Sequence, residues 1–198
     1  MNYLAHAYLS FDHEEILVGN MISDFVKGKK KFDYTSGIQK GIALHRSIDE
    51  FTDAHQITKK AKQYFKPAVG LYAGAFMDVV YDHFLANDKK EFANDAALFS
   101  FTQNTYSFLE KNIVISPERF QMMFPNMKKY NWLYNYQFNF GMEKSFGGLV
   151  RRAKYLTDSS EAFKIFEKEY QYFKNYYEAF FPELKKYTQQ QLKQMLAE

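Results

Sequence analysis

Histidine and carboxylate side chains recur in this sequence at a spacing that suits metal binding. His45 precedes Asp49 by four residues, and Asp78 precedes Asp82 by four, with His83 directly after it. On an α-helix, side chains four residues apart lie on one face with their Cβ atoms about 5–6 Å apart. Imidazole and carboxylate groups together bind divalent ions such as Mn²⁺, Fe²⁺ or Zn²⁺, and the harder ions are favoured where cysteine is absent. The spacing predicts a helical pocket that holds a metal ion.

Each of these pairs also has a simpler interpretation. A single His–Asp pair on a helix is more often a surface ion pair than a metal site, and an Asp–His dipeptide arises by chance in a chain of this size. We expect His13 and His55 to be solvated. The metal interpretation is favoured by the apolar residues around His45 and around Asp82-His83, because charged groups are costly to bury unless they are paired or bound to a metal.

The first 26 residues differ from the rest of the chain in charge. They contain four carboxylates and no lysine or arginine, and Asn20 and Asp24 repeat the four-residue spacing near their end. A basic patch follows directly, made of Lys27, Lys29, Lys30 and Lys31. Such a patch is most often a solvated loop, and the alternative is a landing site for an acidic partner or a phosphate.

The elements that position these residues are predicted to be helices. Only 9 Gly and 4 Pro occur in 198 residues, and apolar residues recur at intervals of three and four, as in residues 38–51 and 163–177. Strand-like alternation of useful length, internal repeats and linkers are absent from the sequence. We therefore expect an all-α fold with a single compact multi-helix domain over residues 1–198.

Several helix starts can be predicted from capping residues. Asp12 followed by Glu15 resembles a capping box that opens a helix running toward Phe25, because the Asp side chain can accept from the third amide of the helix while Glu reaches back. Two further starts are typical of the sequences at Ser116-Pro117 and at Asp158 with Glu161.

The composition excludes several classes of function. With no cysteine, the chain has no disulfide framework, no cysteine-ligated zinc or iron–sulfur cluster and no thiol nucleophile. The formal net charge of +3 is too small to indicate nucleic-acid binding. The longest nearly unbroken apolar stretch, residues 68–77, is about half the length of a membrane-spanning helix, and residues 1–6 lack the features of a secretory signal. We therefore expect a cytoplasmic protein that binds neither nucleic acid nor membranes.

Aromatic residues are unusually frequent, at 19% of the chain. Many fall between positions 120 and 140, where they could line a pocket for an acyl chain or a stacked base, although such side chains are more often core. The residues concerned are Phe120, Phe124, Trp132, Tyr134, Tyr136, Phe138 and Phe140. Binding of single-stranded nucleic acid would interleave Lys and Arg with these aromatics, and residues 130–140 contain neither.

Taken together, these motifs resemble the acyl carrier protein phosphodiesterase family. The resemblance covers the first 85 residues well and the second half loosely, where it includes Gly147–Arg152. It is carried by four blocks in the family's order: Met1–His6; Gly19–Gly28; Gly41–Asp49 with Phe51–Asp53; and Asp78–Leu85. The resemblance implies an architecture like that of divergent HD-type metal-dependent phosphohydrolases. It also implies hydrolysis of the phosphodiester that joins 4′-phosphopantetheine to a serine of holo acyl carrier protein, with Mn²⁺ as the usual metal and Fe²⁺, Mg²⁺ or Zn²⁺ as alternatives.

Carried over residue by residue, the resemblance gives Asp24 the central role, as metal ligand and catalytic residue, the acidic residue whose loss should be most damaging. The further ligand candidates and supporting residues are His6, His45, Asp49, Asp78, Asp82 and His83. Tyr8 stands where a second histidine is common in the opening motif, so a ligand at that position would be altered or dispensable here. Cations that could stabilise charge on the phosphate are Lys27, Arg46 and Arg151, and the lysine patch would steer an acidic carrier protein.

Two other functions remain open from the sequence. The same pocket could act on a nucleotide or another small phosphodiester, because similar helical sites serve many phosphate esters. Alternatively, the chain could be a non-catalytic helical interaction protein whose acids and histidines form ion pairs. A di-iron oxygenase is disfavoured because the Glu-x-x-His pairs of such bundles are missing. The sequence leaves the oligomeric state open.

Overall fold

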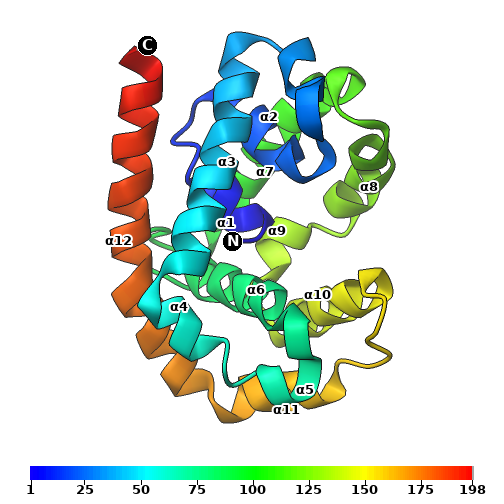
Figure 1. The fold of residues 1–198 in the computed structure, drawn as a ribbon, viewed down its shortest axis with the longest axis vertical. Coiled ribbons are helices and arrows are strands. Elements are labelled where there is room, and N and C mark those ends of the chain that lie inside the picture. The colour runs from blue at the N-terminus through cyan, green and yellow to red at the C-terminus, as the bar shows by residue number, and fades with distance from the viewer. Residues whose placement is uncertain (198) are drawn as a thin grey trace.

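Residues 1–197, which the computed structural model describes, fold into α-helices joined by short connections (Figure 1). In chain order the α-helices are α1 Tyr3–Tyr8, α2 Glu14–Ile22, α3 Ser36–Ala54, α4 Gln56–Ala61, α5 Lys66–Val69, α6 Ala73–Ala86, α7 Asp95–Lys111, α8 Glu118–Lys129, α9 Trp132–Asn135, α10 Asn139–Arg152, α11 Ser160–Lys168 and α12 Tyr170–Ala197. Short 3₁₀ turns cover Ser23–Phe25, Gly28–Asp33, Gly70–Tyr72 and Ile113–Ile115. No strand occurs among these residues, so the all-α prediction is confirmed. The likeness to HD-type architecture and the extent of one domain over residues 1–198 stay predictions.

The two longest helices form one side of the molecule. α12 lies beside α3 and α4 and runs in the opposite direction to α3 (Figure 1). α6 crosses the middle of the molecule and contacts α1, α10 and α12. On the other side, α9 lies between α8 above and α10 below (Figure 1). No helix among residues 1–197 combines the length and the apolar character that crossing a bilayer requires.

α2 and α3 pack closely because each places a glycine against the other. A Cβ atom at Gly19 would lie 2.1 Å from the carbonyl oxygen of Ile38, and one at Gly41 would lie 2.3 Å from the carbonyl oxygen of Ile16. Both glycines belong to blocks that carry the family resemblance. The missing side chains let the two backbones approach, and this approach brings the end of α2 next to His45.

The aromatic residues supply much of the core. Phe65 stacks on Phe173 with ring centroids 5.0 Å apart, and Tyr81 stacks on Phe180 at 4.8 Å. These four side chains are buried. In the aromatic-rich segment, Phe120, Phe124 and Tyr136 are buried as expected of core residues, whereas Phe138 and Phe140 are exposed.

The predicted capping box at Asp12 is wrong. Asp12 has a φ of +62°, in the left-handed region, and α2 begins after it at Glu14. Glu15 accepts a hydrogen bond from the Thr35 hydroxyl instead of reaching back to residue 12. The reason is that the tight turn after α1 fixes the backbone of Phe11 and Asp12 in the left-handed conformation.

The other two helix starts are placed as predicted. α8 begins at Glu118, directly after Ser116-Pro117. α11 begins at Ser160, whose backbone N–H donates to Asp158 Oδ2 at 3.1 Å. Neither start uses the predicted cap: the N-cap residues are Pro117 and Ser159, and neither side chain caps the helix.

Candidate metal centre

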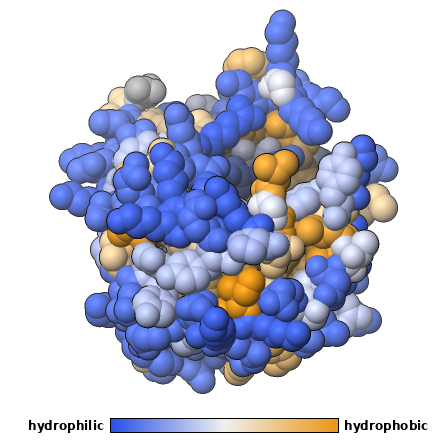
Figure 2. Space-filling view, turned by 60° about the horizontal axis from the view of Figure 1, so that its bottom comes forward, coloured by the Kyte–Doolittle hydropathy of each residue, from blue (hydrophilic) through white to orange (hydrophobic). Residues whose placement is uncertain are grey.

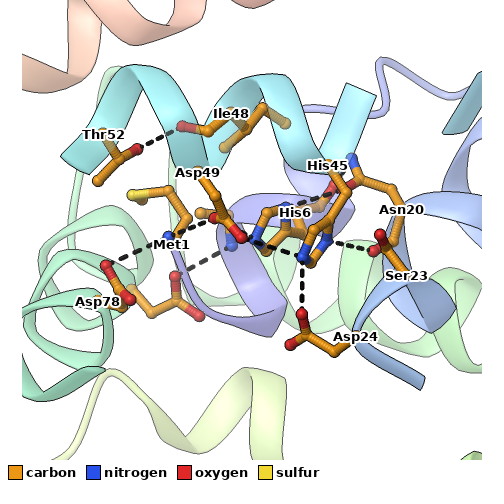
Figure 3. Close-up of polar contacts among 12 residues, drawn as sticks. Met1, His6, Asn20, Ser23, Asp24, His45, Ile48, Asp49, Thr52 and Asp78 are labelled. Atoms are coloured by element: carbon orange, nitrogen blue, oxygen red, sulfur yellow. Dashed lines mark hydrogen bonds and ion pairs between the residues drawn. The ribbon is translucent and has the colours of Figure 1, made fainter. Parts of the chain in front are cut away.

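Four side chains from three segments converge beside α3 (Figure 3). His6 comes from α1, Asp24 from the 3₁₀ turn after α2, and His45 and Asp49 from successive turns of α3. One nitrogen or oxygen from each of His6, His45 and Asp49 lies within 4.8 Å of the others, which is close enough for them to share one metal ion. The two imidazole rings stack with centroids 3.8 Å apart and planes 12° apart.

Asn20 orients both imidazoles. Its side-chain nitrogen donates to the carbonyl oxygen of His6 at 2.8 Å and to the Ser10 hydroxyl at 3.1 Å, so its side-chain oxygen faces Nδ1 of His6 at 2.8 Å. The carbonyl oxygen of Asn20 lies 2.7 Å from Nδ1 of His45. Both oxygens only accept, so each histidine donates from Nδ1 and directs Nε2 toward the carboxylates.

The two Nε2 atoms therefore face carboxylate oxygens. Nε2 of His6 lies 3.2 Å from Asp49 Oδ1, and Nε2 of His45 lies 3.2 Å from Asp24 Oδ1 and 3.1 Å from Asp49 Oδ2. In their neutral forms both nitrogens would present lone pairs to negative oxygens. Lone pairs that face carboxylates repel one another unless a positive charge lies between them.

A proton supplies that positive charge at His45. Burial opposes a charge on His45, but the hydrogen-bonded Asp24 and Asp49 carboxylates outweigh burial and raise its pKa to about 9. The hydrogen bond from His45 in turn lowers the pKa of Asp24. Asp49 is also buried in part, yet the Met1 ammonium and the two histidines hold its pKa below the usual range.

His6 is different, because burial and the neighbouring charge of His45 lower its pKa to about 4. Its neutral Nε2 is buried and has no hydrogen-bond partner. A buried nitrogen lone pair that faces a carboxylate and has no hydrogen-bond donor is typical of a metal ligand. Two imidazoles with nearby carboxylates are donors that suit a divalent ion. The residues present therefore fit a bound metal.

Asp78 lies at the edge of this cluster and pairs with the Met1 ammonium rather than with an imidazole. The Met1 nitrogen lies 3.0 Å from Asp49 Oδ1 and 3.2 Å from Asp78 Oδ1 (Figure 3). The ammonium is buried, and the two carboxylates outweigh burial and raise its pKa to about 11. Asp78 thus contacts the cluster through Met1, which sequence reasoning had not included.

Asp82 and His83 lie apart from the two imidazoles. The Asp82 carboxylate accepts from the backbone N–H groups of Leu4 at 2.7 Å and Ala5 at 3.2 Å, so it binds the first turn of α1 to α6. Burial raises the pKa of Asp82 to about 7. His83 contacts the carbonyl oxygen of Tyr136 and the hydroxyl of Tyr170, at 2.7 and 2.9 Å. We therefore leave both out of the candidate ligand set, and their metal roles stay predictions.

The remaining histidines and Tyr8 also lie outside the cluster. His13 is exposed, as expected, and His55 is partly buried, with Nε2 3.3 Å from Glu183. The Tyr8 hydroxyl contacts Glu91 and Lys185.

The three cations predicted to bind phosphate occupy different places. Lys27 is exposed at the start of the lysine patch, and Arg46 follows His45 on α3 and donates to the carbonyl oxygen of Val26 at 3.4 Å. Arg151 lines a separate cavity beside α10. The structure thus brings together His6, His45 and Asp49, with Asp24 against His45; of the three cations, only Arg46, next to His45 in the chain, lies on one of the same segments.

Asn20 is the residue whose role sequence reasoning missed. Its four-residue spacing from Asp24 was visible, but that spacing does not reveal that its side chain and carbonyl oxygen hold two histidines from different helices. Replacing Asn20 with alanine is expected to weaken Mn²⁺ binding by about 10- to 100-fold, because partners that fix a ligand's tautomer and orientation have effects of this size. Isothermal titration calorimetry of Mn²⁺ measures the effect.

The matched control for Asn20→Ala is Ser23→Ala. Ser23 is also buried in this segment but donates only to the carbonyl oxygen of Ile42, at 3.4 Å. We expect its Mn²⁺ affinity to equal that of the original protein. Equal affinity in both variants would contradict the role of Asn20.

An all-α fold that brings two imidazoles and the Asp49 carboxylate together, with the Asp24 carboxylate against one of the imidazoles, defines a helical protein with a candidate divalent-metal centre. Comparison with known proteins identifies the family to which this helical protein belongs. The sequence profile described as acyl carrier protein phosphodiesterase matches residues 1–184. The chain belongs to this family, as its motifs predicted, and the match extends through the second half, where the motifs were only loosely similar.

Three curated relatives named acyl carrier protein phosphodiesterase illustrate the similarity. The protein from Pectobacterium atrosepticum is 32% identical over 185 residues, which cover 93% of this chain and 95% of the relative. That from Photorhabdus laumondii is 29% identical over 182 residues, or 92% of each chain. That from Yersinia pestis is 29% identical over 189 residues, or 96% of this chain and 98% of the relative. No solved structure matches the chain.

Proposed function

We propose that this protein hydrolyses the phosphodiester between 4′-phosphopantetheine and the serine of holo acyl carrier protein, in the cytoplasm, with a divalent ion as cofactor. The products are apo carrier protein and free 4′-phosphopantetheine. The observation that carries the proposal is the convergence of two imidazole Nε2 atoms on the carboxylates of Asp24 and Asp49. Mn²⁺ is the proposed ion, because imidazole with carboxylate and no thiolate suits the harder divalent metals. Family membership supports the choice of substrate.

The reaction needs positive charge because a phosphodiester is anionic and resists attack by water. His6, Asp24, His45 and Asp49 would hold the metal, which supplies charge to neutralise the phosphate oxygens and makes a nearby water more acidic. The other roles in the reaction belong to the protein's own side chains. Asp24 is ionised at neutral pH, since positive charge beside it, supplied by His45 in the metal-free protein and by the ion when metal is bound, lowers its pKa, so its carboxylate can orient the attacking water and accept its proton.

The direction of substrate approach follows from exposure. The His6 and His45 side chains are 4% and 7% exposed, whereas that of Asp24 is 70% exposed. The phosphodiester therefore approaches past Asp24, and the imidazoles form the floor of the site. Lys27, Arg46 and Arg151 are the proposed cations for the non-bridging oxygens, since each is near one side of this entrance or of the adjoining cavity.

The function is tested with holo acyl carrier protein and the chelator-treated enzyme. Mass spectrometry is expected to detect loss of phosphopantetheine from the carrier when Mn²⁺ is restored, and no loss without metal. Mg²⁺, Fe²⁺ and Zn²⁺ are compared in the same assay. If a panel of small phosphodiesters is cleaved and the carrier is not, the substrate is wrong. If no metal binds and nothing is cleaved, the protein is a non-catalytic interaction protein.

The lysine patch is expected to steer the acidic carrier protein. Lys29 and Lys30 are exposed on the 3₁₀ turn after Asp24. The double variant Lys29→Gln/Lys30→Gln is expected to lower kcat/KM for holo carrier protein several-fold at low salt, because long-range charge accelerates association. The difference should shrink near 0.5 M salt, where screening acts over only a few ångströms, about 3–5 Å.

The control for this prediction is Lys164→Gln/Lys168→Gln on α11, which removes the same charge from two exposed lysines at the far end of the molecule. Its kcat/KM is expected to change little. If both double variants lower kcat/KM equally, net charge rather than the patch is responsible.

A further inference from the structure

A large cavity lies beside the candidate metal centre, between α8, α9 and α10, with parts of α1 and α6 in its wall. Its volume is about 690 Å³, which is within the range of small-molecule sites. Figure 2, in which the lower end of Figure 1 comes forward, shows a hollowed surface where hydrophobic residues are visible among hydrophilic ones. The metal centre does not explain this cavity, because none of its four donors lines it.

The cavity and the metal centre share two stretches of chain. Met1 contacts Asp49, and the next two residues, Asn2 and Tyr3, line the cavity. On α6, Asp78 contacts the Met1 ammonium, and the next residue, Val79, lines the cavity. Because consecutive Cα atoms are about 3.8 Å apart, the cavity begins within one or two residues of the cluster.

Tyr3 connects the two sites electrostatically as well. Burial raises the pKa of its phenol, the positive charge of Arg152 opposes the shift and the negative charge of Asp24 reinforces it. The Tyr3 hydroxyl also donates to Met123 Sδ at 3.4 Å, and both Met123 and Arg152 line the cavity. The phenol is therefore part of the cavity wall, one residue from Asn2 and two from Met1.

The residues that line the cavity are complementary to a neutral, amide-containing chain that ends in an anion. Its apolar surface comes largely from aromatic side chains, among them Tyr130, Trp132 and Phe140. Among the lining residues there is no carboxylate, while Lys144, Arg151 and Arg152 contribute positive charge.

Amide groups also line the cavity. Asn2 and Asn135 use their amide nitrogens on the Tyr136 hydroxyl and the Tyr130 carbonyl oxygen, both at 2.8 Å. Each amide also carries an oxygen that can accept from a ligand's N–H group. A purely apolar ligand would leave these oxygens without partners.

We propose that this cavity binds the pantetheine arm of the substrate, with the arm's methyl and methylene groups on the aromatic wall, its amides on Asn2 and Asn135, and its phosphate directed toward Asp24 and the arginines. The inference rests on the proposed function and assigns its specificity to α8, α9 and α10. The pantetheine arm fits because it alternates apolar and amide groups and carries charge only at its phosphate. Recognition of the arm explains how one phosphodiester can be selected among many.

Trp132, the single tryptophan of the chain, lines the cavity and reports on its occupancy. Titration of the metal-free protein with 4′-phosphopantetheine, and separately with pantetheine, is expected to change Trp132 fluorescence saturably. Inorganic phosphate is expected to leave the fluorescence unchanged. The absence of a saturable change with either arm compound would overturn the proposal.

Two adjacent glycines of α10 provide a matched pair of variants. Gly148 lines the cavity and Gly147 does not. At each position the nearest atom to an added Cβ is a guanidinium nitrogen of Arg151, 3.6 Å away, which is an ordinary contact. Leucine is also a better helix former than glycine, by about 0.8–1 kcal/mol. Both Gly148→Leu and Gly147→Leu should therefore fold.

Gly148→Leu is expected to weaken arm binding at least ten-fold and to raise KM for holo carrier protein, whereas Gly147→Leu leaves both unchanged. Equal affinities in the two variants would overturn the proposal. The test also separates this inference from the proposed function. Cleavage of the carrier without a Trp132 response rejects the cavity alone, and a Trp132 response without cleavage rejects the hydrolysis alone. If apo carrier protein, which lacks the arm, gives the same response as the arm, the occupant is the carrier's surface and the proposal fails.

Discussion

Replacement of Asp24 with alanine is expected to abolish release of phosphopantetheine, with kcat lowered by about 10³-fold or more. Asp24 is the exposed carboxylate of the cluster, and its Oδ1 lies 3.2 Å from Nε2 of His45. Its removal deletes both a ligand and the group that orients the attacking water. Mass spectrometry of the carrier protein measures the loss.

The fold should survive this substitution, since most of the Asp24 side chain is in solvent. Far-UV circular dichroism is therefore expected to be unchanged. Asp24→Asn, which keeps the shape and removes the charge, is expected to be nearly as inactive. Asp53→Ala is the control, because Asp53 is an equally exposed carboxylate on α3 whose ion-pair partner is Lys62. If Asp24→Ala retained activity, Asp24 would have no catalytic role.

The second large effect is expected from Gly41→Ala, which should destabilise the protein by about 3 kcal/mol or more. The new methyl group would lie 2.3 Å from the carbonyl oxygen of Ile16 and 2.9 Å from the Cα of Gly19. Both are backbone atoms, which cannot turn aside as a side chain can. α2 and α3 must therefore separate, and urea unfolding measures the resulting loss of stability.

The same separation should weaken metal binding. α2 carries Asn20 and leads into Asp24, while α3 carries His45, so a shift between the helices lengthens the contacts that orient the imidazole. Gly147→Ala is the control, because its methyl group has nothing closer than 3.6 Å and alanine favours a helix. Equal stabilities of Gly41→Ala and Gly147→Ala would show that close packing of α2 on α3 is not required.

Contacts within a single helix could be predicted from the sequence. His45 and Asp49 face the same point because four residues make slightly more than one helical turn, whatever the rest of the fold does. The pair Asp82 and His83 shows the limit of this reasoning. Adjacent residues on a helix point about 100° apart, so Asp82 faces α1 while His83 faces Tyr136 and Tyr170. Which of the two faces lies toward the cluster depends on how α6 packs.

The sequence by itself determined the helical character, the absence of cysteine chemistry, the family and the pairing of His45 with Asp49, because these depend on composition and on spacing within one helix. The tertiary structure decided the contacts between helices. These are the hydrogen bonds from His6 and His45 to Asn20, the ion pairs of Met1 with Asp49 and Asp78, and the cavity beside them. The physical reason is that a helix fixes the spacing of its own side chains, whereas its rotation and distance relative to another helix follow from packing, here from two glycines that allow α2 and α3 to touch.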